Sequence, residues 1–176
     1  NEAYSGKKTA DSTDSFENEE NKASTDAENH HLMDNLRFDK VARIPVPDLE
    51  VQGDKDDADL LIVGFGSTYG HLYSAMQELR AKGHKIALAQ FKYVNPLPKN
   101  TAEVLSRYSK VVVAEQNLGQ LAALLRIRIN NFAPYQYNQV KGQPFVVQEL
   151  VQGFERLLTL PAPKDEYGTF YSRILQ

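Results

Sequence analysis

Short apolar runs alternate with segments of helical periodicity from residue 60 onward, and this alternation constrains the fold more than any other feature. The runs lie at 60–63, 85–91 and 111–114. Apolar residues without polar alternation are typical of strands buried on both faces. Between the runs, apolar side chains recur every three or four residues, which is typical of helices with one buried face. Such repeats form right-handed crossovers, so the sequence predicts an α/β fold: a three-layer sandwich with a mainly parallel sheet.

Local signals place the ends of several elements. Gly83 is expected to end the first helix of this region. Two pairs have the spacing of a helix-capping box and predict helix starts: Asn100 with Glu103, and Asn117 with Gln120. A last helix over 147–158 and a weakly indicated fourth strand near 138–140 complete the prediction.

Composition divides the chain into three expected parts: a polar, acidic arm and linker (1–57), an α/β domain (58–160) and a C-terminal tail (161–176). The stretch 1–31 holds three lysines against eight acids, with Tyr4 and Phe16 its only large apolar side chains. This composition favours a mobile or extended arm, either a solvated linker or a loop ordered by a partner subunit. Apolar residues over 32–42 indicate a short helix. The tail carries Tyr167, Phe170 and Tyr171, which fit packing on a partner and packing on the domain equally well.

The loop Gly64-Phe65-Gly66-Ser67-Thr68-Tyr69-Gly70 follows the first strand and opens the first helix. Small residues there allow backbone N–H groups to approach an anion at a helix N-terminus. The spacing differs from the G-x-G-x-x-G dinucleotide fingerprint, and no acid follows the second strand at Lys92. The loop is therefore interpreted as a tight turn capped by Ser67 or Thr68, with anion binding as the alternative.

Two more loops are expected on the same edge, because the carboxyl ends of parallel strands meet there. They are Asn95-Pro96-Leu97-Pro98 and Glu115-Gln116-Asn117-Leu118-Gly119-Gln120. Helix capping explains Asn117 and Gln120 but leaves Glu115 without a role. The candidate residues for contact with a ligand or a subunit are Gly64, Gly66, Ser67, Thr68, Gly70, Asn95, Glu115, Asn117 and Gln120.

Other kinds of chemistry find little support in the residues. The absence of cysteine excludes thiolate catalysis, disulfides and an iron–sulfur cluster held by this chain alone. Two of the four histidines lie in the arm and the other two are isolated, and Ser67 has no identifiable base, so we expect no metal site and no catalytic residue. The formal charge of −3 and the absence of a long apolar run argue against nucleic acid and membrane as partners. Cytoplasm is the expected compartment, and we expect the chain to be cut or processed from a longer polypeptide because it begins with Asn1.

Together these loops resemble the C-terminal part of 2-oxoacid:ferredoxin oxidoreductase alpha subunits, the 2-oxoglutarate enzymes most closely. Two further segments are similar to the family's linker and late loop: Ser24-Thr25-Asp26-Ala27-Glu28-Asn29-His30 and Tyr137-Asn138-Gln139-Val140-Lys141-Gly142. The likeness runs from about residue 24 to residue 158. It implies a fold similar to the C-terminal domain of transketolase-type enzymes, a domain that braces the catalytic domains and helps the subunits assemble.

The resemblance also implies a complete enzyme that uses thiamine diphosphate, Mg²⁺, an iron–sulfur cluster and coenzyme A to convert a 2-oxoacid into acyl-CoA, CO₂ and reduced ferredoxin. The implied partners are the remaining domains of the alpha subunit, a beta subunit carrying thiamine diphosphate and the cluster, and ferredoxin. Gly53-Asp54-Lys55 is the nearest approach to the family's magnesium-diphosphate motif and lacks its second glycine. The fragment is therefore expected to bind no cofactor and to be inactive alone. The alternatives are a stand-alone module that binds an anion or nucleotide at Gly64–Gly70, and a pure protein-interaction domain.

Overall fold

A computed structural model of the chain describes residues 26–163 and 174–175, and the chain forms two compact units, residues 1–45 and 46–176. The described part of the first unit contains the helix α1 (Ala27–Ala42), and Asp26 caps it by accepting a hydrogen bond from the Glu28 N–H at 2.9 Å. The helix expected over 32–42 is confirmed. The expectation of an extended arm is wrong for 27–31, because the cap at Asp26 starts the helix five residues earlier; the rest of that arm, 1–25, lies outside the described residues.

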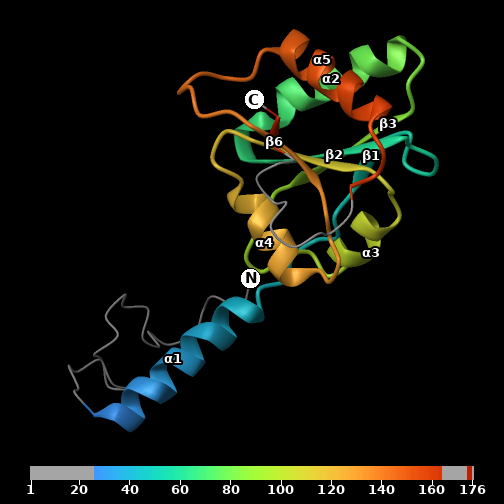
Figure 1. The fold of residues 1–176 in the computed structure, drawn as a ribbon. Coiled ribbons are helices and arrows are strands. Elements are labelled where there is room, and N and C mark those ends of the chain that lie inside the picture. The colour runs from blue at the N-terminus through green and yellow to red at the C-terminus, as the bar shows by residue number, and fades with distance from the viewer. Residues whose placement is uncertain (1–25, 164–173, 176) are drawn as a thin grey trace. The chain divides into compact units, whose positions relative to one another are not determined.

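A six-stranded sheet in the order β1-β3-β2-β4-β5-β6 forms the framework of the second unit (Figure 1). Its strands are β1 (Val51–Gly53), β2 (Leu60–Phe65), β3 (Ile86–Phe91), β4 (Val111–Glu115), β5 (Tyr135–Asn138) and β6 (Ile174–Leu175). The strand β1 is antiparallel to β3, and every other neighbouring pair is parallel. The predicted mainly parallel sheet is confirmed.

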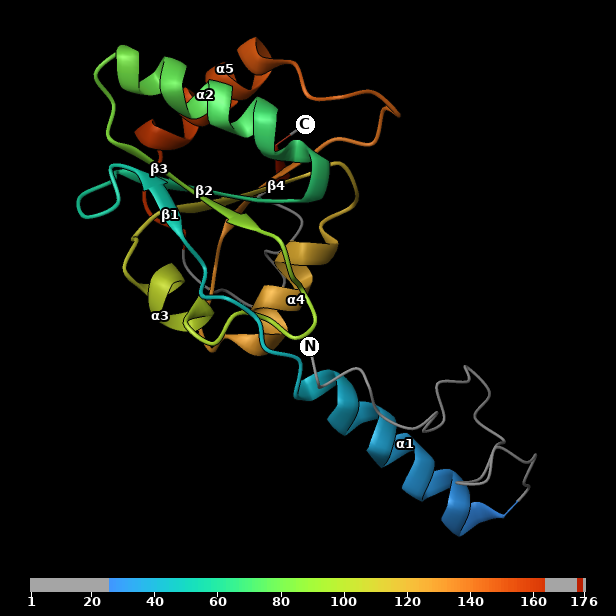
Figure 2. The ribbon, with the colours of Figure 1, turned by 180° about the vertical axis from the view of Figure 1, so that it is seen from behind.

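Helices cover both faces of this sheet (Figures 1 and 2). One face packs against α2 (Tyr69–Ala81) and α5 (Val147–Thr159), and the other against α3 (Thr101–Ser106) and α4 (Gln120–Arg128). Within β2, Leu60 and Ile62 belong to the first core while Leu61 and Val63 belong to the second. A strand buried on both faces needs an apolar residue at every position, and this is why the runs show no alternation.

The compact unit begins at Val46, earlier than the predicted boundary at residue 58. The strand β1 lies within the predicted linker and pairs with β3 through Val51 opposite Ala89. Gly53 ends β1 with φ of +83°, and a Cβ at this position would lie 2.4 Å from the carbonyl oxygen of Ile86. An edge strand of three residues is too short to show a period of two, so the sequence pattern did not reveal it.

The capping box predicted at Asn100 is wrong. The Asn100 side chain makes no cap bond; its amide accepts from the Leu49 N–H at 2.8 Å and donates to the Leu49 carbonyl at 3.0 Å. This pair ties the segment before β1 to the start of α3. The fourth strand is confirmed but begins earlier than expected, at Tyr135. The aromatic residues of the tail lie outside the described residues, while Ile174–Leu175 pair with β5.

Asp54 follows β1 and connects three elements. Its carboxylate accepts two hydrogen bonds from the Arg80 guanidinium, at 2.7 and 3.1 Å, and one from the Ile86 N–H at 3.1 Å. The hydrogen bonds from Arg80 hold the pKa of the Asp54 carboxyl below its ordinary value of 3.8. This ion pair is partly exposed, so its effect on stability is modest.

We expect Asp54→Asn to lower the free energy of unfolding by about 1 kcal/mol at neutral pH. Because the folded-state pKa is lowered, the difference between wild type and variant should be complete above about pH 5 and should disappear as the pH falls through the folded-state pKa, below 3.8. Urea unfolding of both chains between pH 2 and pH 7 measures this difference. A difference that grows as the pH falls below 4 would contradict the assignment.

Candidate functional site

Loops that follow β2, β3, β4 and β5 meet at one edge of the sheet, because these strands are parallel. We call these loops, residues 65–70, 92–98, 116–119 and 139–146, the carboxyl rim. Figures 1 and 2 show the loops after β2, β4 and β5 on the same side of the domain. All nine predicted site residues lie on this rim or directly beside it, so the fold brings together the three loops that the sequence singled out.

The first loop is a single 3₁₀ turn, η2 (Gly66–Thr68), between β2 and α2. The Thr68 hydroxyl donates to the Phe65 carbonyl at 2.9 Å and accepts from the Phe65 N–H at 3.3 Å. Thr68 is therefore buried and closes the turn, whereas Ser67 and Gly70 are exposed. Gly66 has φ of +64°, and a Cβ added there would point into space not occupied by the described residues. This geometry supports the interpretation of a tight turn with Thr68 as its hydrogen-bonding residue.

Gly64 serves close packing. A Cβ at this position would lie 2.3 Å from Leu72 Cδ1, 2.6 Å from Gln90 Oε1 and 3.0 Å from Thr68 Oγ1. The absent side chain thus lets α2 and the Gln90 side chain approach β2. Close packing therefore explains why residue 64 is a glycine, and the hydrogen bonds with the Phe65 backbone explain Thr68.

We expect Gly64→Ala to lower the free energy of unfolding by about 2 kcal/mol, because the added methyl overfills a packed site. Gly70→Ala is the matched control: Gly70 lies in the first turn of α2, and a Cβ added there would have no non-neighbouring atom of the described residues within 4 Å, so its replacement should be neutral or stabilising by about 0.5 kcal/mol. Thermal unfolding of the two variants measures both effects. Equal losses at the two positions would show that packing is not the reason for Gly64.

Glu115, for which capping left no role, is itself a cap. It is 4% exposed, and its two carboxylate oxygens accept hydrogen bonds from the Leu121 and Ala122 N–H groups of α4 at 2.6 and 2.9 Å. A helix N-terminus has unpaired donors and a positive field, both of which a carboxylate satisfies. The structure thus assigns Glu115 an internal contact rather than an orientation toward the rim surface.

Asn117 continues this arrangement. Its side-chain oxygen accepts from the Gly119 N–H at 2.7 Å and from the Gln120 N–H at 3.0 Å, so Asn117 does satisfy donors just before and at the start of α4. The predicted capping box is wrong, because Gly119 occupies the cap position and Gln120 is the first residue of the helix. Gly119 has φ of +95°, and a Cβ there would lie 2.3 Å from Gln136 Oε1. Gln120 is exposed. The loop after β4 is therefore held from inside by Glu115 and Asn117, and its Gly119 lies against the buried Gln136.

The loop after β3 borders a groove of about 650 Å³. Asn95 is exposed at its tip and precedes Pro96 through a cis peptide bond. The groove is lined by the segment before β1, by Gly66 and Tyr69 of the first loop, and by the end of β3 with Lys92 and Tyr93. The groove therefore lies between the carboxyl rim and residues 47–50, through which the chain enters the second unit.

Gln90, in β3 directly beside the carboxyl rim, was not among the predicted site residues. Its amide nitrogen donates to the Gly66 carbonyl at 3.0 Å and so ties β3 to the first loop. Its Oε1 atom is buried and has no hydrogen-bond partner among the residues that the structure describes. The signal was present in the sequence, because Gln90 is the only polar residue in the apolar run of β3.

The described residues offer little to a metal or a phosphorylated cofactor. No group of three His, Cys, Asp or Glu side chains suitable for a metal ion occurs within 26–163. Asp54, the nearest match to a magnesium-diphosphate motif, is engaged by Arg80 and Ile86. The His84 ring lies 3.9 Å from the Glu155 carboxylate, and this pair is on the side of the domain away from the rim loops. No helix in the described residues is long and apolar enough to cross a membrane.

Comparison with known proteins decides the family. Residues 58–150, more than half of the chain, match the family described as pyruvate:ferredoxin oxidoreductase core domain II. The chain belongs to this family. The predicted resemblance to 2-oxoacid:ferredoxin oxidoreductase alpha subunits is thereby confirmed.

Relatives of this core domain II are subunits of 2-oxoacid oxidoreductases. The 2-oxoglutarate oxidoreductase subunit KorA of Mycobacterium tuberculosis is 46% identical over 122 residues, which are 69% of this chain and 18% of that protein. Subunit alpha of 2-oxoacid:ferredoxin oxidoreductase 2 of Aeropyrum pernix is 32% identical over 118 residues, 66% of this chain and 18% of that protein. The chain thus spans 18% of the length of these curated relatives.

A solved structure gives the same result for the fold. The 2-oxoglutarate:ferredoxin oxidoreductase from Magnetococcus marinus, with 2-oxoglutarate, coenzyme A and succinyl-CoA bound, matches 82% of this chain and 26% of its own chain. The TM-score is 0.70 at 30% sequence identity. The α/β domain described above is therefore one part of a larger protein in this relative.

Proposed function

We propose that this core domain II is the assembly domain of the alpha subunit of a 2-oxoglutarate:ferredoxin oxidoreductase and contributes no reacting group itself. The 46% identity to KorA is the reason for proposing 2-oxoglutarate as the substrate. The relative from Magnetococcus marinus, with 2-oxoglutarate and coenzyme A bound, supports the same substrate. In the complete enzyme 2-oxoglutarate, coenzyme A and two oxidised ferredoxins would give succinyl-CoA, CO₂, two reduced ferredoxins and one proton. The partners are the rest of the alpha subunit, a beta subunit and ferredoxin.

The chemistry of this chain's own residues supports an assembly role. Thiamine diphosphate and Mg²⁺ do not fit here, because Asp54 is occupied by Arg80 and its segment lacks the second glycine of the motif. An iron–sulfur cluster does not fit either, because the sequence contains no cysteine. These groups are therefore proposed to be held by other parts of the enzyme.

The nine predicted site residues enter this proposal with two roles. Gly64, Thr68, Glu115 and Asn117 make the internal contacts that shape the rim. The exposed members face outward and are proposed to contact the rest of the enzyme: Gly66, Ser67, Gly70, Asn95 and Gln120. A stand-alone nucleotide site is less well supported, because close packing accounts for Gly64 and turn closure accounts for Thr68.

Purification of the full-length protein from its source, with mass spectrometry of co-purifying chains, tests the proposal. We expect a cysteine-rich partner, and we expect the eluate to reduce a viologen dye in the presence of coenzyme A, fastest with 2-oxoglutarate among several 2-oxoacids. The 176-residue chain alone should reduce none. A protein that purifies alone and shows no activity with any 2-oxoacid would contradict the assignment.

A further inference from the structure

Exposed apolar side chains are concentrated on the carboxyl rim. Among the described residues of the second unit, nine large hydrophobic side chains are exposed. Six of them lie on the rim: Phe65, Tyr69, Tyr93, Leu118, Val140 and Val146. Leu118 and Val140 are 76% and 65% exposed at the tips of separate loops. Single exposed apolar residues are ordinary on a protein surface, but a group on one edge marks an interaction site.

The two edges of the sheet differ in charge. The four rim loops contain Lys92 and Lys141 and no acidic residue, although Asp48 and Glu50 line the groove beside Lys92. The opposite edge carries the turn 54–59, in which four of the six residues are acidic, and Lys85 and Lys110. Depletion of charge together with enrichment in tyrosine and phenylalanine is the composition of a protein–protein interface core. The opposite edge has the composition of a surface that stays in water.

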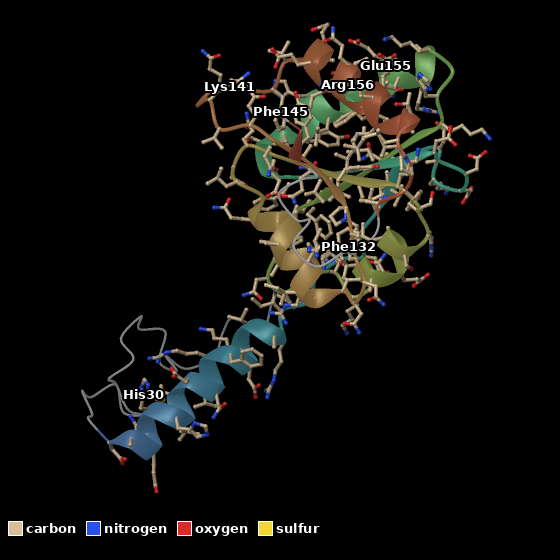
Figure 3. All side chains as sticks on the ribbon, in the orientation of Figure 1. His30, Phe132, Lys141, Phe145, Glu155 and Arg156 are labelled. Atoms are coloured by element: carbon tan, nitrogen blue, oxygen red, sulfur yellow. The ribbon has the colours of Figure 1, made fainter. Side chains whose placement is uncertain are left out.

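Contacts with the interior of the domain and with each other hold the loops that carry these side chains in place. Phe145, 3% exposed, packs edge-to-face on Tyr137 with ring centroids 5.7 Å apart, and so anchors the loop 139–146. Figure 3 shows Phe145 near the body of the domain and Lys141 at the outer part of the same loop. Gln116 donates to the Gln143 carbonyl at 2.7 Å and joins this loop to the loop after β4. A surface ordered in this way binds without a large loss of loop entropy.

The path of the chain indicates what covers the rim. Because β1 is antiparallel to β3, the polypeptide that leads into β1 arrives at the rim, where residues 47–50 line the groove beside Tyr69 and Tyr93. Any segment joined there has a high effective concentration at this surface. The curated relatives are more than five times longer than the stretch that this chain matches, so a large part of the same polypeptide remains to be placed.

We propose that the carboxyl rim is a domain interface within the alpha subunit, covered by the remaining part of the same polypeptide. The covering surface is expected to be largely apolar, to match the six exposed apolar side chains of the rim. This inference depends on one part of the proposed function, namely that the complete alpha chain is longer than these 176 residues.

Cysteine labelling of the full-length alpha chain tests the interface. The 176 residues contain no cysteine, so Leu118→Cys introduces one thiol within them, and mass spectrometry of the labelled peptide distinguishes it from thiols elsewhere. Ile127→Cys is the matched control, because Ile127 is 80% exposed on α4, away from the rim, and Leu118 is 76% exposed. Val140→Cys tests a second loop in case one substitution disturbs its own loop.

We expect maleimide to label Leu118→Cys and Val140→Cys at least tenfold more slowly than Ile127→Cys in the folded full-length alpha chain, and all three equally fast in urea. Equal rates in the folded chain, or equal protection of Ile127→Cys, would overturn the proposal. Protection that appears only after the beta subunit is added would also overturn it and would identify the occupant as the partner subunit. The labelling needs no activity, so an inactive wild-type enzyme would refute the proposed function and leave this result unaffected.

Discussion

Replacement of Phe154 by alanine should lower the free energy of unfolding of the chain by about 4 kcal/mol, the largest effect that we expect from a single substitution. Phe154 lies in the middle of α5, is 0% exposed and packs edge-to-face on Tyr137 with ring centroids 5.7 Å apart. Phenylalanine-to-alanine changes in cores cost about 3–5 kcal/mol, because apolar burial is lost and a cavity remains. The aromatic pair adds about 1 kcal/mol to the loss.

The core around Phe154 has little freedom to collapse into the cavity that the alanine would leave. Gly153 allows the Tyr137 ring to approach α5, since a Cβ there would lie 2.8 Å from Tyr137 Cε2. Phe154→Leu keeps most of the volume and removes only the aromatic contact, so its loss should be about 1.5 kcal/mol. Urea unfolding followed by far-ultraviolet circular dichroism measures both variants. Losses below 1.5 kcal/mol for Phe154→Ala would show that α5 is not packed on the sheet as described.

Glu115→Ala should lower the free energy of unfolding by about 3 kcal/mol. The substitution removes two charge-assisted hydrogen bonds and leaves the Leu121 and Ala122 N–H groups of α4 without their acceptor inside the protein. Glu115→Gln retains one carbonyl oxygen as an acceptor, so its loss should be about half as large. Equilibrium unfolding in urea at pH 7 gives these values.

A matched comparison within the same loop separates capping from general disturbance. Asn117 accepts from the N–H groups of Gly119 and Gln120 but is only half-buried, so water replaces it in part. Asn117→Ala should therefore cost about 1 kcal/mol. Equal losses at the two positions would contradict the buried-cap assignment for Glu115. The same variants should weaken contact between the rim and the rest of the enzyme, because this cap orients the loop that displays Leu118.

The architecture was predictable because its signals are local. The strands β2 and β4 are short apolar runs that burial on both faces requires. Leu72, Ala75, Met76 and Leu79, all nearly inaccessible, mark the buried face of α2, and Gly83 follows with φ of +93°. The family resemblance was equally available, since it depends on ordered motifs along the chain.

Contacts between distant segments were not predictable, because nothing local distinguishes them. Asn100 has the spacing of a cap, yet its side chain bonds Leu49, 51 residues earlier in the chain. The strand β1 forms because its backbone can pair with β3. A segment of three residues is too short for its sequence pattern to indicate a strand. A periodicity describes the face that a segment buries, and it does not identify the segment's partner.

The candidate site shows the same division. The sequence by itself determined which loops follow the parallel strands, and therefore that Gly64–Gly70, Asn95–Pro98 and Glu115–Gln120 meet at one edge. Only the tertiary structure decided which side chains of those loops turn inward. Glu115 turns toward the N-terminus of α4, whereas Leu118, three residues later, is exposed. Side-chain direction depends on which donors and which free volume the neighbouring elements provide, and these exist only once the sheet and its helices are assembled.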